Sequence, residues 1–160
     1  MSKLKFSFLV LMLMVSVSAS ADWAPADVQA ALKKMYPTAD DVAWSHDESY
    51  YVADFLMNGF DTKVSFDGQA QWVMQQTDWE TMDEVPPAVY NAFAASEYSG
   101  GMVQNVTWVQ FPKWQSIVAV EVGMANLQTK YQILFTPTGE IIRARNVTYT
   151  YNPLGAATFL

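Results

Sequence analysis

Two segments of the chain repeat apolar residues at the spacing of a single helix face. The residues at i, i+3, i+4 and i+7 are Val28, Ala31, Leu32 and Met35 in the first segment, and Val89, Ala92, Phe93 and Ser96 in the second. This spacing is typical of an amphipathic helix. Prolines stand at the start of each segment, where a missing N–H costs no hydrogen bond. The pattern predicts helices over 25–36 and 87–98.

Short segments that alternate apolar and polar residues follow each predicted helix. Alternation with a period of two is typical of strands with one buried face. Turn residues in the gaps, such as Asp67-Gly68, indicate antiparallel hairpins. The pattern predicts strands at 41–46, 50–57, 61–67, 70–77, 103–110, 115–123, 127–135 and 140–149.

The two halves of the chain match each other in order and spacing. Trp44 and Trp108 stand at the same place in the first strand of each half, and Phe66 and Phe135 in the third. Such an internal repeat indicates one supersecondary unit used twice. We therefore predict an α+β fold in which two tandem helix-plus-four-strand modules form one antiparallel sheet of about eight strands, with the helices on one face. The expected boundaries are a signal peptide at 1–21, a first module at 22–77, a linker at 78–84, a second module at 85–149 and a C-terminal tail at 150–160.

The alternation also assigns residues to the two faces of the sheet. The residues expected beneath the helices are Val64, Phe66, Trp72, Met74, Ile133, Phe135 and Ile141. The residues expected on the opposite face are Tyr50, Val52, Leu56, Val73, Val118, Val120 and Leu134. An apolar second face favours a docking surface. The alternative is that the chain termini or the partner repeat cover it.

In this order, the residues resemble the PepSY-like module of small secreted bacterial proteins, a family related in fold to the beta-lactamase inhibitory (BLIP-like) proteins. The first half carries the pattern in Val28, Ala31-Leu32, Tyr36-Pro37, Ala39, Trp44, Tyr51, Phe55, Val64, Phe66-Asp67 and Trp72. The second half carries a weaker version in Pro86-Pro87-Ala88-Val89, Trp108, Phe135 and Gly139. The resemblance covers about residues 24–147.

The resemblance implies helices on one face of an antiparallel sheet, with the other face concave and available to a protein. It implies binding or inhibition of an extracellular enzyme rather than catalysis. The sequence departs from the family in two respects: it has no cysteine for the disulfides of the beta-lactamase inhibitory proteins, and its second half lacks the Tyr-Pro and Phe-Asp pairs. The fold expectation survives both departures. Beta-lactamase as the target does not follow, because a fold does not determine a function.

The N-terminus has the three parts of a secretory signal. Lys3 and Lys5 are positive, an apolar run covers 6–17, and residues 19–21 read Ala-Ser-Ala before the expected first mature residue, Asp22. We therefore expect a periplasmic or secreted protein. Cleavage removes both lysines, so 7 of the 9 basic residues remain against 16 acidic ones and the net charge becomes −9. So acidic a surface argues against nucleic acid as a partner, and we expect no membrane span in the mature chain.

Residues that enzymes and metal sites need are sparse in this sequence. The chain has no cysteine and one histidine, His46, whose neighbour Asp47 is too close in sequence to orient it as a catalytic triad does. No zinc or EF-hand calcium spacing occurs. Adjacent acidic residues point apart on a strand or turn, unlike the facing carboxylates of a glycosidase. We therefore expect no enzymatic activity, no metal and no cofactor.

Two predicted hairpin turns provide the candidate partner-binding site. The turn between the first two strands brings Asp47 and Tyr50, and its counterpart in the second half brings Phe111 and Trp114. A turn needs only polar residues, whereas exposed aromatic side chains are typical of interface hot spots. The alternatives are that Trp114 folds back onto the sheet or that Tyr50 caps its edge.

From these residues we predict an exported, non-catalytic module that binds a protein partner. Docking would use the hairpin tips and the concave sheet face, and inhibition of an extracytoplasmic enzyme is one form that this binding would take. The alternative function is a periplasmic carrier of a small apolar or envelope ligand, which would lie on the open sheet face.

Overall fold

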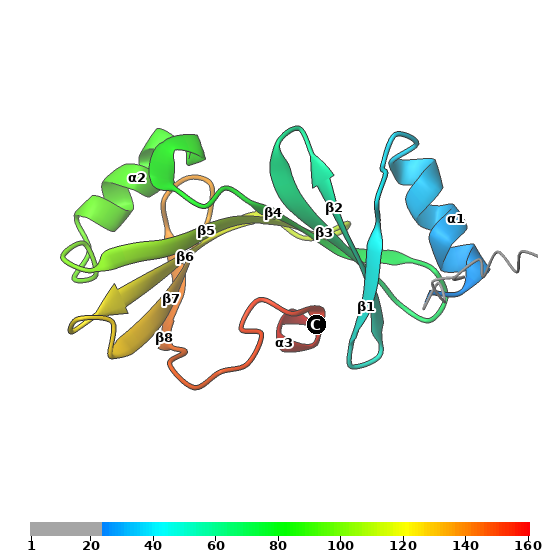
Figure 1. The fold of residues 1–160 in the computed structure, drawn as a ribbon. Coiled ribbons are helices and arrows are strands. Elements are labelled where there is room, and N and C mark those ends of the chain that lie inside the picture. The colour runs from blue at the N-terminus through cyan, green and yellow to red at the C-terminus, as the bar shows by residue number, and fades with distance from the viewer. Residues whose placement is uncertain (1–23) are drawn as a thin grey trace, which may run out of the picture.

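The computed structural model describes residues 24–160 (Figure 1). The predicted signal peptide at 1–21 and the expected mature start at Asp22 lie outside these residues. The elements in chain order are α1 (Ala26–Met35), β1 (Ala43–Asp47), β2 (Tyr50–Met57), β3 (Phe60–Phe66), β4 (Trp72–Asp78), η1 (Met82–Glu84), α2 (Pro87–Ala94), β5 (Met102–Gln110), β6 (Ile117–Met124), β7 (Thr129–Phe135), β8 (Ile141–Asn146) and α3 (Ala156–Phe159). Every predicted helix and strand is present, with its ends within four residues of the expected positions.

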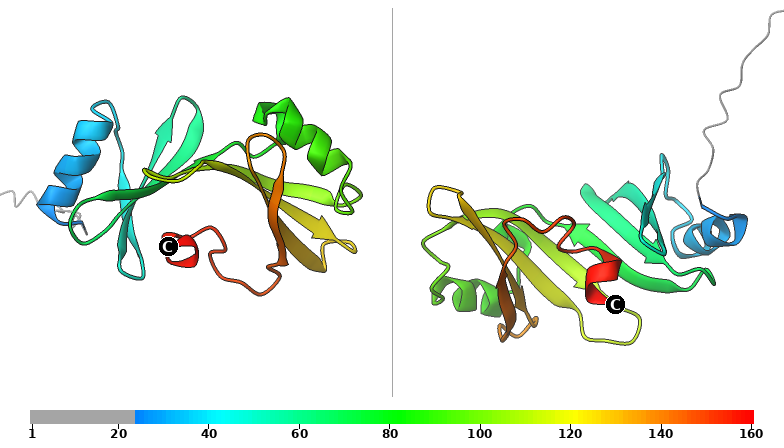
Figure 2. Two further views of the ribbon diagram at one scale, coloured as in Figure 1. Left: turned by 180° about the vertical axis from the view of Figure 1, so that it is seen from behind. Right: turned by 90° about the horizontal axis from the view of Figure 1, so that it is seen from below.

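The strands form one antiparallel sheet of eight, in which each strand pairs with the next along the chain. The sheet arches between the two longer helices, with α1 and α2 on its convex side (Figure 1). The short helix α3 lies beneath the arch, and the views from behind and from below agree on this placement (Figure 2). The predicted α+β fold with helices on one face is therefore confirmed for α1 and α2. Helix α3, on the opposite face, is an element that the sequence pattern does not predict.

Helix α1 covers the first strands with a narrow apolar stripe. Its buried residues Val28 and Leu32 pack against Phe66, which is fully enclosed. Tyr36 follows the helix and places its ring 5.3 Å from that of Phe55. Burial of these side chains, at about 25 cal/mol per Å² of apolar area, holds the helix on the sheet.

Helix α2 covers the later strands in the same way. Val89 and Phe93 are buried against Phe135, which is also fully enclosed. The segment that leads into this helix contributes Trp79, whose ring is stacked on that of Trp108 with centroids 5.4 Å apart. The expected linker, 78–84, thus places an aromatic side chain against the core beneath α2.

One residue predicted beneath α1 lies on the opposite face of the sheet. Met74 is buried in a cluster on the concave side. In the ladder between β3 and β4, Phe66 faces Trp72. Its neighbour Ser65 faces Met74, which leaves Val73 as the extra residue of a β-bulge. A bulge shifts the alternation beyond it, so the prediction for Trp72 is right and that for Met74 is wrong.

The face prediction for β6 is also wrong. Val118 and Val120, predicted on the open face, are fully buried in the cluster beneath α2. Strand β6 is buried at every residue but its last, so its sequence is apolar at nearly every position and the alternation is lost. Ile141 pairs with Phe135 as expected for the helix face, but it is exposed because β8 is an edge strand.

The C-terminal segment, residues 151–160, covers part of the concave face. After β8 the chain turns back beneath the arch and ends in α3 (Figure 1). Ala156 is buried there, and Leu154 and Phe159 pack against an apolar floor. This floor consists of Met74, Val109, Ile117, Ala119 and Leu134. The C-terminus therefore covers the centre of this face, which was one of the two alternatives that the sequence left open.

Candidate binding surface on the concave side

Three hairpin turns lie close together at one end of the strands, because alternate turns of an antiparallel meander lie at the same end. These turns join β1 to β2, β3 to β4, and β5 to β6. Between them lies a hollow of about 400 Å³, which we call the aromatic hollow. Its lining residues include Tyr50, Trp72, Phe111, Trp114 and Leu160, with Asp67 and Lys113 as the charged members.

Three of the four predicted binding residues line the aromatic hollow: Tyr50, Phe111 and Trp114. Tyr50 and Phe111 are half-buried, whereas Trp114 is 60 % exposed. The ring of Phe111 lies 5.4 Å from that of Trp114 and 5.9 Å from that of Phe159. The structure thus brings together aromatic side chains from turns that are far apart in the sequence. Tyr50 and Phe111 also pack against the apolar floor, so both have a part in folding.

The fourth predicted residue, Asp47, contacts the C-terminal segment instead. It ends β1, is half-buried, and its carboxylate accepts a hydrogen bond from the backbone N–H of Ala157 at 3.2 Å. It also lines a second hollow of about 410 Å³, together with Tyr151 and Asn152. Asp47 is therefore engaged within the chain, and the sequence pattern gives no sign of this contact.

Side chains of the sheet hold the backbone of the C-terminal segment. Gln132 and Arg145 both donate to the carbonyl of Pro153, at 3.3 and 2.7 Å. Gln76 donates to the carbonyl of Leu154. Gln132 is fully buried, and its side-chain oxygen accepts from Arg145 at 3.2 Å. These three side chains recognise main-chain oxygen atoms, which any sequence would offer.

The guanidinium of Arg145 sits in a partly dehydrated place. Burial, and then the nearby positive charge of Arg143, lower the pKa of Arg145. An arginine nevertheless stays protonated in proteins. Its bond to the carbonyl of Pro153 is therefore charge-assisted, and such bonds are stronger than those between neutral groups.

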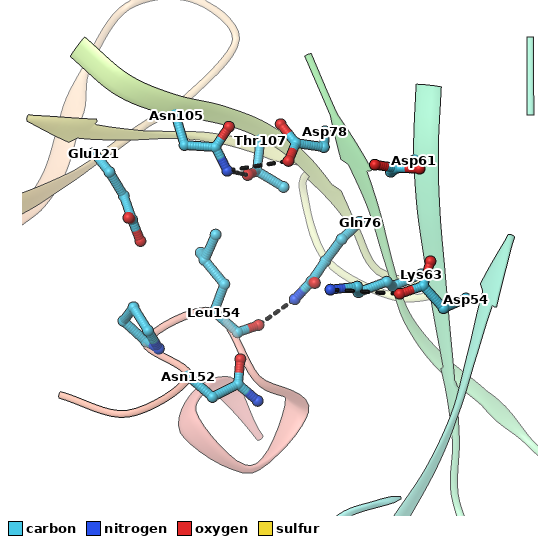
Figure 3. A pocket seen from close by; sticks show the side chains of 11 residues that line it. Asp54, Asp61, Lys63, Gln76, Asp78, Asn105, Thr107, Glu121, Asn152 and Leu154 are labelled. Carbon is cyan, nitrogen blue, oxygen red and sulfur yellow. Dashed lines mark hydrogen bonds and ion pairs between the residues drawn. The ribbon is translucent and has the colours of Figure 1, made fainter. Parts of the chain in front are cut away.

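A polar hollow of about 350 Å³ opens beside the C-terminal segment (Figure 3). The strands supply most of its lining, and Asn152, Pro153 and Leu154 supply the rest. Lys63 lies 3.6 Å from the carboxylate of Asp54 within it. The acidic lining residues are Asp54, Asp61, Asp78 and Glu121. This part of the concave face is therefore polar and mainly negative, unlike the aromatic hollow.

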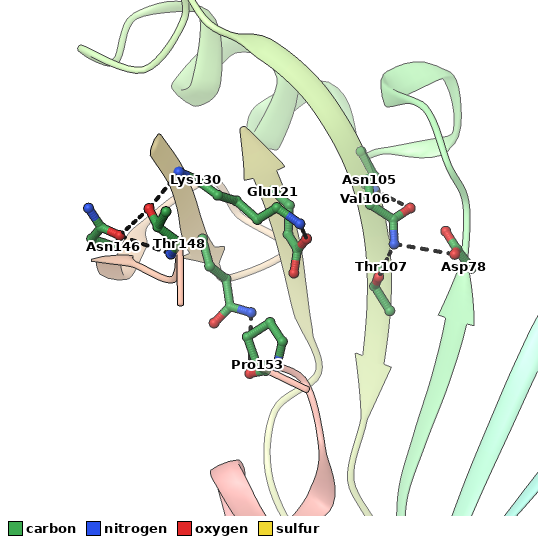
Figure 4. A network of polar contacts seen from close by, with 10 residues as sticks. Asp78, Asn105, Val106, Thr107, Glu121, Lys130, Asn146, Thr148 and Pro153 are labelled. Carbon is green, nitrogen blue, oxygen red and sulfur yellow. Dashed lines mark hydrogen bonds and ion pairs between the residues drawn. The ribbon is translucent and has the colours of Figure 1, made fainter. Parts of the chain in front are cut away.

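A network of polar contacts lies next to this hollow (Figure 4). The ammonium group of Lys130 lies 3.3 Å from the carboxylate of Glu121, whose side chain is only 11 % exposed. The backbone N–H of Lys130 donates to the hydroxyl of Thr148 at 2.9 Å, and that hydroxyl donates to Asn146 at 2.6 Å. A carboxylate this buried requires a partner, and Lys130 of β7 provides it for Glu121 of β6. The bonds to Thr148 and Asn146 then join β7 to the end of β8 and the chain that follows it.

The single histidine and the acidic residues do not form a metal site in the part of the chain that the structure describes. No group of three or more metal-ligating side chains is close enough together among residues 24–160. His46 is exposed on β1, with its ring 4.7 Å from that of Tyr51.

Reasoning from the sequence missed the residues that hold the C-terminal segment: Gln76, Gln132 and Arg145. One signal was present. Gln132 stands between Tyr131 and Ile133 in a strand that is otherwise mostly buried, and a buried polar side chain requires a hydrogen-bonding partner. The identity of that partner depends on how the chain folds back after β8, which no local pattern encodes.

Known proteins share this pattern of sequence and fold. The family model described as "Putative beta-lactamase-inhibitor-like, PepSY-like" matches residues 49–143, more than half of the chain. The chain belongs to this PepSY-like family. The resemblance inferred from the sequence is confirmed.

Solved structures from Bacteroides species are similar to this PepSY-like protein over most of its length. A DUF2874 family protein from Bacteroides uniformis ATCC 8492 is 98 % identical, with a TM-score of 0.85, and the match covers 86 % of this chain and 100 % of that one. A structure described as "putative periplasmic proteins" from Bacteroides eggerthii DSM 20697 is 70 % identical, with a TM-score of 0.83 over 86 % and 99 % of the two chains. A BLIP-like protein from Bacteroides fragilis NCTC 9343 is 30 % identical, with a TM-score of 0.74 over 82 % and 93 %. No curated protein matches the chain.

The PepSY-like protein is periplasmic or secreted, as its sequence predicts. The relative from Bacteroides eggerthii is described as periplasmic, and the family is extracytoplasmic. Within residues 24–160, every helix is too short or too polar to cross a membrane.

Proposed function

We propose that this PepSY-like protein is an exported, non-catalytic module that binds a protein partner through the aromatic hollow and the adjoining concave face. The observation that carries the proposal is the convergence of Tyr50, Phe111 and Trp114, from two separate turns, on one open hollow. Trp114 is 60 % exposed and adds little to the buried core, whereas Tyr50 and Phe111 are partly packed against the apolar floor. Clustered aromatic anchors of this kind dominate the binding energy of protein interfaces.

The family favours a protein as the ligand and an enzyme as the target. Its description is beta-lactamase-inhibitor-like, and one solved relative is described as BLIP-like. The proposed partner is therefore an extracytoplasmic enzyme whose activity falls when the module binds. The charge of the module also favours some partners over others. A module with a net charge near −9 repels acidic surfaces and favours a partner with a neutral or basic surface.

A carrier of a small apolar ligand is the second candidate, and one observation favours it. Apolar side chains, among them Phe111, Trp114 and Leu160, make up much of the lining of the aromatic hollow. The hollow, at about 400 Å³, falls within the range of roughly 300–1,000 Å³ that is usual for ligand sites. A carrier purified from a periplasm would show a bound small molecule in native mass spectrometry. A mass equal to that of the polypeptide alone would count against this function.

The proposed function is tested by capture from envelope extracts of a Bacteroides species, the source of the relatives. Trp114→Ala removes the most exposed aromatic side chain of the hollow, and Tyr90→Ala on α2 removes one of similar exposure, 54 %, on the convex side. Loss of an aromatic anchor costs about 2 kcal/mol, or roughly thirtyfold in affinity. We expect Trp114→Ala to lose the captured protein and Tyr90→Ala to retain it. Equal capture by both variants would place the interface elsewhere.

A further inference from the structure

The C-terminal segment contacts the sheet as a bound peptide contacts its receptor. Polar side chains of the sheet donate to its carbonyl groups at Pro153 and Leu154. The carboxylate of Asp47 accepts from its backbone at Ala157. The apolar side chains of Leu154, Ala156 and Phe159 pack against the apolar floor. The concave surface therefore binds a short stretch of backbone together with a few apolar side chains.

The packing around the segment is incomplete. The polar hollow of about 350 Å³ and the second hollow of about 410 Å³ both have Asn152 in their lining. At the entrance to the segment, Tyr149 and Tyr151 are 100 % and 97 % exposed. Both hollows open to solvent, so part of the segment lacks the close packing that surrounds a chain inside a protein core. A segment with hollows along it and an exposed entrance opens at a lower free energy than the whole fold.

The chemistry of the segment is narrow. Residues 151–160 contain no charged side chain. The single turn of α3 places Ala156, a small residue, against the floor, and Phe159, three residues later, against the ring of Phe111. The next residue, Leu160, lines the aromatic hollow. The groove under the segment and the aromatic hollow are therefore one continuous surface, and a partner that enters at the tips meets the end of the segment.

We propose that the concave face is a peptide-binding groove whose resident occupant is the C-terminal segment, and that the partner protein displaces this segment with an uncharged stretch of its own that carries a small residue and, three residues later, an aromatic one. The apolar floor selects such a stretch, while Gln76, Gln132 and Arg145 bind its main chain. This inference rests on the proposed function, in that it names the part of the partner that the concave face would bind.

The direct test supplies the occupant as a separate molecule. A chain truncated after Thr150 is titrated with a peptide of residues 151–160 with blocked ends, and the total tryptophan fluorescence, to which Trp114 at the hollow contributes, is recorded. We expect saturable binding, and binding at least tenfold weaker to the full-length chain, whose own segment is present at a high effective concentration. The control peptide carries Leu154→Ala and Phe159→Ala, which remove the side chains that meet the floor, and should not bind. A truncated chain that is folded but does not bind the peptide would overturn the proposal.

A second measurement uses the full-length chain and does not depend on whether the truncated chain folds. Hydrogen exchange of the Ala157 amide, which is bonded to Asp47, is compared with that of the amides in β6. A displaceable segment opens without global unfolding, so we expect Ala157 to exchange at least a hundredfold faster than β6. Exchange of Ala157 and β6 at one common rate would show that the segment is part of the core and would overturn the proposal.

A third variant links the groove to the partner. A Cβ at Gly155 would overlap both Asn152 and the carboxylate of Asp47, so Gly155→Ala loosens the segment in an otherwise complete chain. We expect this variant to capture the partner about tenfold more tightly than the wild type. Peptide binding without any captured partner would refute the proposed function alone. A partner captured equally by the wild type and Gly155→Ala, with no peptide binding, would refute the groove alone.

Discussion

The replacement Phe135→Ala tests whether α2 packs on the sheet as described. Phe135 is fully enclosed, faces Val118 across the ladder to β6, and lies in one cluster with Val89 and Phe93 of α2. Removing a buried phenylalanine ring costs about 3–5 kcal/mol, because the surroundings close the cavity only in part. A domain of this size has a total stability of about 5–15 kcal/mol. The variant should therefore still fold, with much of its margin lost.

Urea denaturation followed by tryptophan fluorescence measures this loss. With a slope of about 2 kcal/mol per M, a cost of about 4 kcal/mol lowers the midpoint by about 2 M. The equivalent change beneath α1, Phe66→Ala, should have a similar effect, because Phe66 is equally enclosed. The control is Leu56→Ala, a side chain that is 67 % exposed, which should change stability by less than about 0.5 kcal/mol. Unchanged midpoints for both phenylalanine variants would refute the assignment of the helix face.

Two further predictions concern a turn and the N-terminus. Gly139 has a φ of +89°, and a Cβ there would lie 2.5 Å from the carbonyl oxygen of Ala88, so Gly139→Ala should destabilise the fold by about 1–3 kcal/mol in the same assay. Gly68→Ala is its control, because the space around Gly68 is open, and an equal loss in both variants would contradict the argument. The chain expressed with its leader in a Gram-negative host should be recovered from the periplasm with Asp22 as its first residue, as N-terminal sequencing would show. A full-length chain in the membrane fraction would contradict that expectation.

The sequence predicts the helices and most strands because their burial is one-sided. A stripe such as Val28 and Leu32 is visible in the sequence, since the other side of α1 faces water. The same logic fails in β6, where helix α2 covers one face and the apolar floor continues on the other. With both faces buried, Val118 and Ala119 are equally apolar, and the alternation that would orient them disappears.

The bulge in β4 shows a second limit of sequence patterns. One extra residue, Val73, moves Met74 to the concave side while Trp72 stays beneath α1. Nothing in the composition of β4 marks this residue as extra, because all three side chains are apolar. The placement is decided by pairing with β3, which is a property of two strands together.

The candidate site was predictable only in part. Tyr50, Phe111 and Trp114 could be singled out because aromatic residues at predicted turns are unusual, and the antiparallel order of the strands brings those turns to one end of the sheet. The packing of the C-terminal segment on the concave face could not be predicted. Its contacts with Asp47 and Arg145 join residues that are distant in sequence, and its apolar residues form only one helical turn, which is too short to give a periodic signal.

Binding of a partner protein at the aromatic hollow is tested most directly by photo-crosslinking in intact cells. A photo-crosslinking amino acid is placed at position 114 in one strain and at position 90 in another, and each strain is irradiated. Trp114 lies at the edge of the aromatic hollow and Tyr90 lies on the convex helix α2. We expect a crosslinked protein partner from position 114 and none from position 90. A partner crosslinked from position 90 alone would contradict binding through the aromatic hollow.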